Sequence, residues 1–376
     1  MASRLLTQLA SRIAAAGDPV EAACLRAQRG IYLARQGKHE QAQAIVEAVR
    51  GEFGVRPNAE VTAWISLVEA LIHFYSQPGP KALDRLKRAH ALSRAMNHPV
   101  LVPLCAAWLA HLEFNANRME AMLQYAVEAL QLAQPQHHAA LARVSLVIAD
   151  AFHFAGRFDL AKPWYAAVRE HALADGDDAM ISAMLHNVAA FRANEVRLAD
   201  AFGALIPSEA KRALMETEST ENYDVGIGTL SMALLIPLMK AQLLATAGRY
   251  TEALAIFDEV LERDSPENLE RRKACFYADR AWCHIQLGQK DLGLADVERA
   301  CARMSYPADP DDVAFAHARV AEVLSRLGQN ERSLVHKNES IEFRARHVAA
   351  QTELVSRLQT ALSGTRGTRG PTTTNE

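Results

Sequence analysis

The sequence predicts an all-α solenoid of about eight helix-turn-helix repeats that ends in a long C-terminal helix. Three observations predict this fold class. Half of the 376 residues are hydrophobic but only 6% are aromatic, which suits closely packed helices better than sheets. Turns that contain glycine recur along the chain, and small residues recur at a fixed position before and after each turn. Helix pairs of this kind cannot bury their apolar faces alone and must stack on one another.

The turns give the repeat length. Five of them share one form, in which a glycine can end the first helix and a polar residue soon afterwards can cap the second helix. These glycines are Gly37, Gly156, Gly248, Gly288 and Gly328. The last three are 40 residues apart, and the distance of 119 residues from 37 to 156 is three such units less one residue. The repeat is therefore about 40 residues long.

Small residues give the register, because helices approach closely only where side chains are small. The residues seven before each turn are Gly30, Ala70, Ala110, Ala149, Ala189, Ala241, Ala281 and Ala321. The residues twelve after these are Ala42, Ala82, Met122, Ala161, Ala201, Ala253, Gly293 and Ser333. Successive first-helix positions lie 40, 40, 39, 40, 52, 40 and 40 residues apart, so one excess of about a dozen residues follows Ala201.

The elements follow in order from this register. Residues 1–20 are expected to form an N-terminal capping helix, since their apolar core is too short and too interrupted for a signal peptide. Repeats one to five are expected at 21–207, an insertion at 208–228, and repeats six to eight at 229–340. The first helix of repeat six should begin late, because Pro237 follows Gly226 and Gly228.

The C-terminal part has its own pattern. Residues 331–363 overlap repeat eight and contain no helix breaker, so one long helix is expected there. Apolar residues recur in it every seven positions, at Leu334, Ile341, Val348, Val355 and Leu362. This period favours a coiled-coil seam and a possible homodimer, while a helix that simply lies on the last repeat is the alternative. The tail 364–376 has no apolar anchor and is expected to be disordered.

Three places carry a family resemblance: Gly30, the segment from Ala253 to Phe257 followed by Pro266, and the segment from Ala161 to Tyr165. On these residues the chain resembles the tetratricopeptide repeat superfamily, and the resemblance covers about residues 20–340. The unit is 40 residues where 34 is usual, and the first-helix Trp and Tyr are mostly missing. The longer unit is similar to the repeat arms of bacterial transcription activators and to peptide-sensing regulators. The resemblance implies a right-handed superhelix, and HEAT-type repeats are the alternative.

Composition and motifs do not predict an enzyme. The formal charge of -3 and the pI of about 6.5 provide no general attraction for nucleic acid. No apolar stretch reaches 18 residues, so no membrane partner is expected, and the five cysteines without C-x-x-C spacing favour a reducing, cytoplasmic location. Phosphate-binding, nucleophile-elbow and zinc motifs are missing from the sequence, and the pair His137-His138 looks like a turn. We therefore expect no catalytic, cofactor or metal site.

The resemblance implies that a partner binds the concave face lined by the first helices. Applied to this register, it gives aromatic residues surrounded by Arg, Asn and His, which is a composition suited to binding a peptide. The candidates are Trp64, Phe74, Tyr75, His111, Phe114, Asn115, Arg143, Asp150, His153, Phe154, His186, Asn194 and Trp282. The alternative is that many of these rings belong to the core between repeats.

The predicted function is a non-catalytic tetratricopeptide repeat protein that binds a peptide or protein partner in its groove and acts as a scaffold or adaptor. A chaperone-tail adaptor is disfavoured, because the first-helix positions of that clamp are not cationic here. The second hypothesis is a sensory or regulatory protein, related to the repeat arms of transcription activators or diguanylate cyclases, that signals through its C-terminal helix.

Overall fold

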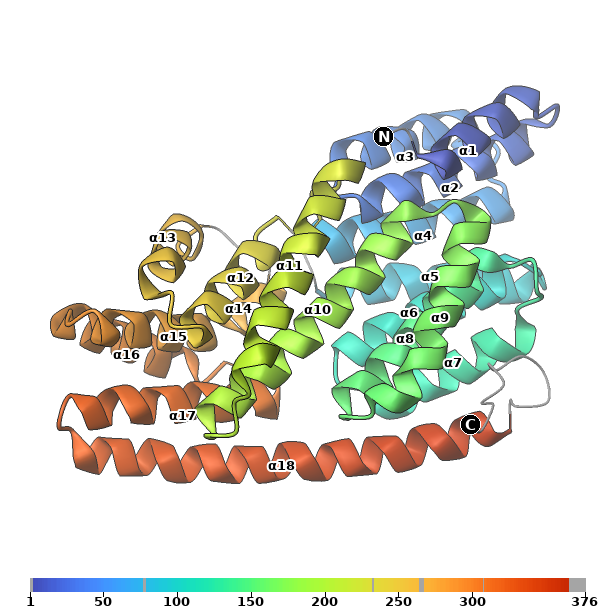
Figure 1. Cartoon of the computed structure of the whole chain (residues 1–376). Coiled ribbons are helices and arrows are strands. Elements are labelled where there is room, and N and C mark those ends of the chain that lie inside the picture. Colours follow the sequence, from blue (N-terminus) through green and yellow to red (C-terminus); the bar gives the residue numbers. More distant parts are fainter. Residues whose placement is uncertain (1–2, 77–78, 232, 264–266, 307, 365–376) are drawn as a thin grey trace. The chain divides into compact units, whose positions relative to one another are not determined.

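The computed structural model describes residues 3–76, 79–231, 233–263, 267–306 and 308–364, and the regular elements in these ranges are all α-helices (Figure 1). Pro266 and the tail from 365 onwards, for which the sequence makes predictions, lie outside the described residues. The chain divides into two compact units. The first comprises Met1–Leu185, Tyr223–Ser231 and Thr352–Glu376, and the second comprises His186–Asn222 and Met232–Gln351.

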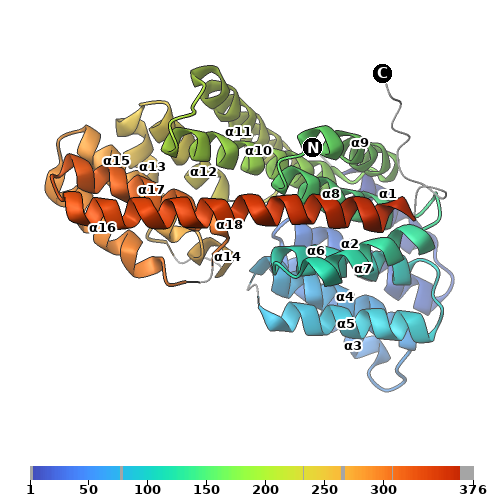
Figure 2. The ribbon, with the colours of Figure 1, turned by 90° about the horizontal axis from the view of Figure 1, so that it is seen from below.

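The first unit is a stack of antiparallel helix pairs. The pairs α2/α3, α4/α5, α6/α7 and α8/α9 follow one another along the chain, and α1 packs on α2 (Figure 1 and, seen from below, Figure 2). First helices also pack on each other, as α2 does on α4 and α6 on α8. The bounds are α1 Arg4–Ala15, α2 Pro19–Arg35, α3 His39–Phe53, α4 Ala59–Ser76, α5 Pro80–Ala95, α6 Leu101–Asn115, α7 Met119–Leu132, α8 His138–Phe154 and α9 Phe158–Asp175.

The second unit repeats the arrangement with α12/α13, α15/α16 and α17, where α12 packs on α15 and α15 on α17. Its helices are α12 Leu235–Thr246, α13 Tyr250–Val260, α14 Glu267–Glu270, α15 Lys273–Gln286, α16 Lys290–Arg303 and α17 Pro310–Arg326. Three helices contribute residues to both units, namely α10 Asp178–Ala201, α11 Pro207–Ile227 and α18 Asn330–Ser363. Pro237 lies in the first turn of α12, which agrees with the late start expected for this helix.

The glycines at the turns do what the sequence predicts. Each of the five has a φ between +71° and +78°, a left-handed conformation that costs glycine little. At Gly37 the amide donates to Ala34 O (3.1 Å) and the next amide, of Lys38, donates to Leu33 O (3.0 Å). The same two bonds close the other four turns, and Asn117 (φ +59°) takes the glycine position in the third pair. These bonds satisfy carbonyls that a helix end leaves free.

Most of the small residues that define the register are buried in the core. Ala70, Ala110, Ala149 and Ala281 are fully buried, as is Ala161 on a second helix. At Gly30 a Cβ would lie 3.1 Å from Val68 Cγ1, closer than an ordinary van der Waals contact. The helices therefore approach closely where the sequence places its smallest residues.

The fifth pair differs from the prediction. The segment 208–228, expected as an insertion, is occupied almost entirely by α11, the second helix of that pair. Val196 stands where the register places the turn, and without a glycine there α10 extends to Ala201 and is 24 residues long. Gly203 (φ +71°) then ends the helix and Pro207 begins α11. The additional residues thus lengthen two helices.

The seven-residue row on the C-terminal helix α18 is mostly exposed within this chain. Leu334, Ile341 and Val348 are 59%, 55% and 52% exposed, whereas Leu362 is buried. Positions seven apart on a straight helix drift by about 20° per step, so a row that begins on the solvent side gradually turns away from it. The residues on α18 that are buried are Ser340, His347, Leu354, Leu358 and Leu362.

No helix within the described ranges combines the length and the hydropathy that crossing a membrane requires.

Candidate functional site

A cavity of about 620 Å³ lies on the first helices of successive pairs in the first unit. Its walls come from α1, α2, α4, α6 and α8, from the end of α9 and from the start of α10, together with loop residues that precede α2, α6, α8 and α10. The first helices of five consecutive pairs therefore contribute to one cavity. This is the face on which the resemblance implies that a partner binds.

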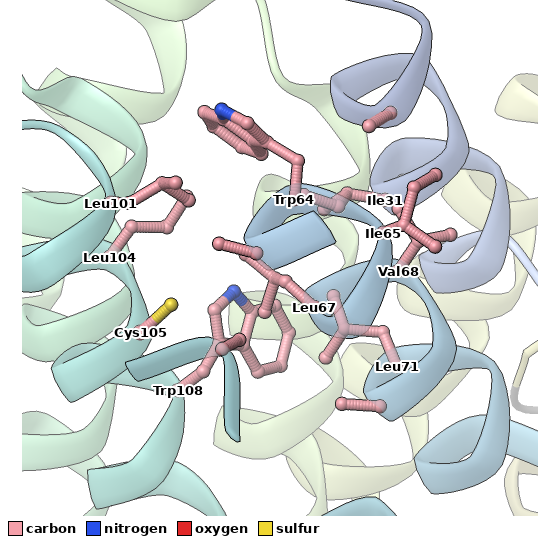
Figure 3. Close-up of a cluster of buried hydrophobic side chains, with 14 of the residues drawn as sticks. Ile31, Trp64, Ile65, Leu67, Val68, Leu71, Leu101, Leu104, Cys105 and Trp108 are labelled. Atoms are coloured by element: carbon pink, nitrogen blue, oxygen red, sulfur yellow. The ribbon is translucent and has the colours of Figure 1, made fainter. Parts of the chain in front are cut away.

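One wall of the cavity is apolar and aromatic. Trp64 from α4 and Leu104 and Trp108 from α6 line it. Figure 3 shows Leu104 and Trp108 on α6 facing the side chains of α4, with the Trp64 indole beside them. His98 packs edge-on against Trp64, with ring centroids 6.5 Å apart. Indole rings offer a large contact area at a low cost in side-chain entropy, which suits a ligand with apolar side chains.

A buried ion pair forms another part of the wall. Arg35 Nη1 and Nη2 donate to the two carboxylate oxygens of Asp177 at 2.6 and 3.1 Å, and these side chains are only 6% and 4% exposed. Burial acts to lower the pKa of Arg35, but the Asp177 carboxylate more than offsets it and the pKa is raised. Asp177 Oδ1 also accepts the amide of Met180, so it caps the first turn of α10 (2.9 Å). The pair thus fixes α2 to the start of α10.

Carboxylates outnumber arginines around the cavity. Asp18, Glu21, Glu60, Asp175 and Asp177 line it, against Arg12 and Arg35. Burial, followed by the charge of Asp177, raises the pKa of the Asp175 carboxyl. The rim therefore presents a negative potential to a ligand.

The cavity contains a thiol, but not an activated one. Burial and then the Glu60 carboxylate raise the pKa of Cys24 to about 12, so the sulfur remains protonated at neutral pH. Glu60 Oε1 accepts a hydrogen bond from Cys24 Sγ at 3.6 Å and lies 3.0 Å from His98 Nε2. This arrangement suits binding better than nucleophilic catalysis.

Several of the predicted partner-binding residues form an aromatic group next to the cavity. Among them only Trp64 lines the cavity itself. Phe74 packs edge-on against Tyr75 (4.9 Å) and His111 (5.3 Å), and Trp108 lies 6.4 Å from Tyr75 and 5.6 Å from His111. The structure brings these rings from α4 and α6 together, with Phe74 and Tyr75 half-buried.

The remaining candidates on α6 and α8 have partners within the repeat stack. The half-buried rings of Phe114 and Phe154 contact each other (6.2 Å), and Asn115 Nδ2 lies 3.3 Å from His111 Nε2. On α8, buried Asp150 accepts a bond from the Tyr165 hydroxyl (3.0 Å), and His153 Nδ1 is 3.1 Å from the same oxygen. Both Asp150 and His153 are therefore buried residues of the stack.

Arg143 differs from the other candidates because it is a buried cation that forms no ion pair with the described residues. It is 1% exposed, and its guanidinium carbon lies 3.8 Å from the centre of the Trp108 ring. In the described part of the chain, Nε and Nη2 have no hydrogen-bond acceptor. Burial lowers its pKa to about 10, which still leaves the group charged at neutral pH.

Three candidates belong to the second unit. His186 is buried, and burial followed by the charge of Arg272 lowers its pKa to about 4. Asn194 donates to Asp311, and the half-buried Trp282 ring has Arg326 above it at 4.6 Å. These three residues make their contacts within that unit and do not line the cavity.

Sequence reasoning missed Arg35 and Asp177. The register that identified Trp64 would also have given Cys24, Ile31 and Arg35 if it had been applied to the first repeat, and all three line the cavity. Asp177 had no comparable signal, because it is 142 residues away from its partner in the sequence.

The described residues contain no group of three or more His, Cys, Asp or Glu side chains that could hold a metal ion. His138 instead faces His171 on α9, with their Nδ1 atoms 3.1 Å apart.

Comparisons with known proteins identify the fold. No family model matches the chain, and no curated protein matches its sequence. The apo form of RapI is 13% identical with a TM-score of 0.50, over 77% of this chain and 99% of that one. A Rap protein complexed with competence and sporulation factor is 13% identical with a TM-score of 0.53, over 93% of this chain and 100% of that one. The chain has a tetratricopeptide-like fold. In this tetratricopeptide-like array the cavity occupies the first-helix face.

Proposed function

We propose that this chain is a non-catalytic binding protein that holds a peptide or protein segment in the cavity of its first unit, as a scaffold or adaptor. The observation that carries the proposal is that the first helices of five successive pairs form one cavity of about 620 Å³, with indole rings on its wall. A volume of this size accommodates a few side chains of a ligand. The similar Rap protein has been solved in complex with competence and sporulation factor, which supports a binding role.

The charge of the rim narrows the type of partner. Five carboxylates against two arginines favour a segment that carries positive charge, such as a lysine, an arginine or a free amino terminus. Arg35 and Asp177 are buried and neutralise each other, so the excess of negative charge comes from the other four carboxylates against Arg12. Charges near the surface mainly affect the association rate and its dependence on salt.

The proposal is tested by filling the cavity. Gln28 on α2 lines it and is half-buried, so Gln28→Trp should occupy the space without entering the core. Gln43→Trp is the matched control, because Gln43 is exposed on the second helix of the same pair. Peptides selected from a displayed hexapeptide library on the full chain are then titrated by calorimetry. Gln28→Trp should abolish binding while Gln43→Trp binds like the wild type; equal binding by both variants would refute the cavity as the site.

A second function is favoured by the exposed face of α18. Leu334, Ile341 and Val348 form a row of apolar side chains that is more than half exposed, which suits self-association or an output contact in a regulatory protein. Sedimentation equilibrium of the wild type and of Ile341→Glu tests this candidate, with Ala349→Glu on the same helix as the control. A monomeric wild type, or a dimer that Ile341→Glu leaves intact, would contradict it.

A further inference from the structure

The indole of Trp64 has a polar atom that the chain itself leaves unused. The side chain is 3% exposed and lines the cavity. Within the described residues its Nε1 has no hydrogen-bond acceptor, yet it is not one of the partnerless nitrogens that are sealed from solvent. The N–H therefore reaches the space of the cavity. Figure 3 shows this nitrogen on the edge of the ring that is turned away from Leu67 and Trp108.

A buried aromatic ring with a polar atom normally has a hydrogen-bond partner for that atom. Tyr32 on α2 follows this rule in the same cavity wall, because its hydroxyl donates to Asp178 and accepts the side-chain amide of Gln36. Trp64 has no such partner in the described structure, so its donor is available to a molecule that enters the cavity. Water accepts this bond while the cavity is open to solvent, and a ligand that displaces the water loses affinity unless it supplies an acceptor of its own.

The direction of this donor is fixed before a ligand arrives. His98 packs edge-on against the indole of Trp64, with ring centroids 6.5 Å apart. The amides of Val100 and Leu101 donate to His98 Nδ1 (both 3.2 Å). The ring proton is therefore on Nε2, which donates to Glu60 (3.0 Å). A histidine held at both nitrogens supports the indole from the side, and a donor that is already oriented costs little entropy on binding.

The charges around Trp64 decide which acceptor fits. Glu60 lies one helical turn before Trp64 on α4, with its side chain 39% exposed. Asp18 and Glu21, at the start of α2, line the same cavity. These carboxylates repel a second anion, so a carboxylate is a poor acceptor at this place. An uncharged carbonyl oxygen satisfies the N–H without that repulsion.

We propose that the indole N–H of Trp64 donates a hydrogen bond to a carbonyl oxygen of the bound peptide, which makes Trp64 a recognition residue for the ligand. This inference rests on the function proposed above. The carbonyl has two sources, the backbone of the peptide or the side chain of an asparagine or glutamine within it. In either case α4 provides a directional contact as well as apolar contact area.

The first test observes the N–H itself. In a nitrogen-15 correlation spectrum of the full chain each of the four tryptophans gives one indole signal, and the Trp64 signal is identified by its loss in Trp64→Phe. Addition of a hexapeptide selected on the full chain should move this signal downfield and slow its exchange with solvent. Trp164 on α9 is the matched control, because it is also mostly buried, at 9% exposed, and does not line the cavity. Its signal, identified with Trp164→Phe, should not move.

The second test separates the N–H from the ring. Benzothienylalanine at position 64, introduced by stop-codon suppression, keeps the shape of the indole and replaces its N–H by sulfur. Fluorescence anisotropy should show binding weakened about 3- to 10-fold, as loss of one hydrogen bond does, and no change for the same replacement at position 164.

The peptide then identifies the source of the carbonyl. If a thioamide at one backbone position weakens binding to the wild type but not to the benzothienylalanine variant, the source is the backbone. If replacing an asparagine or glutamine of the peptide by alanine has this effect, the source is a side chain. If neither replacement has it, the acceptor is not a carbonyl and the inference fails.

Two further results would overturn the inference in different ways. If Gln28→Trp abolishes binding while the Trp64 signal does not move, or while the benzothienylalanine variant binds like the wild type, the cavity is the site but Trp64 does not recognise the ligand. If the wild type binds no peptide better than Gln28→Trp does, the proposed function and this inference both fail. Melting temperatures of the free variants establish that each is folded.

Discussion

The buried pair between Arg35 and Asp177 makes a quantitative prediction. Asp177→Asn keeps the shape of the side chain and its ability to cap α10, and removes only the negative charge. It leaves the Arg35 guanidinium charged and 6% exposed, without its partner. Breaking a buried pair in this way costs about 3–5 kcal/mol. For a unit of this size the melting temperature should then fall by about 6–20 °C.

The exposed pair between Arg157 and Asp159 provides the control. Its side chains are 42% and 60% exposed, so solvent screens the pair and Asp159→Asn should lower the melting temperature far less than Asp177→Asn does. Differential scanning calorimetry gives the melting temperatures, and hydrogen exchange in α2 shows whether the loss is local. Replacing both partners, with Arg35→Met and Asp177→Asn together, should recover most of the stability. If Asp177→Asn costs no more than Asp159→Asn, the pair does not stabilise the first unit as argued.

Three further predictions concern the turns, the C-terminal helix and the response to pH. Gly288 has a φ of +78° and open space around its Cβ position in the described structure. Gly288→Ala should therefore lower the free energy of unfolding, measured in urea, by about 1–2 kcal/mol, and Gly288→Asn should lower it by less, since Asn117 already adopts this conformation. Equal losses in the two variants would contradict this reasoning. Leu358 is fully buried, so Leu358→Ala, at about 2–5 kcal/mol, should speed hydrogen exchange at the end of α18, and unchanged exchange would show that this segment is not anchored there. Burial, followed by His336 with the two Nδ1 atoms 3.0 Å apart, lowers the pKa of His317 to about 4. Because this folded pKa lies below the ordinary value of 6.5, its contribution to stability is present above pH 6.5 and lost as the pH falls towards 4, and His317→Gln should flatten that part of the melting profile; identical profiles would refute it.

The regular part of the fold could be predicted because its determinants are local. A glycine that must adopt a positive φ, as at Gly248, is visible in the sequence, and so is a small residue that lets helices touch, as at Ala241. The fifth pair could not be placed because Val196 gives no such signal. The abundance of alanine allowed Ala201 to match the register by chance, although it is the last residue of α10.

The cavity was harder to predict than the fold. The face and Trp64 could be predicted from the register, because every first helix presents the same positions. The contribution of α1 could not, since a capping helix has no place in the repeat pattern. The ion pair between Arg35 and Asp177 depends on how several helix pairs stack, so the sequence of one helix does not reveal it.

The construction of the cavity affects how a ligand would act on the protein. In a repeat array each pair packs mainly on its neighbours in the chain, so parts of the array can open separately. A ligand that touches the walls from α1 to α10 would hold all of these pairs at once. Ligand binding in the cavity should then make the opening of the first unit more cooperative, because opening of one helix pair would also break the contacts of the ligand with the other pairs.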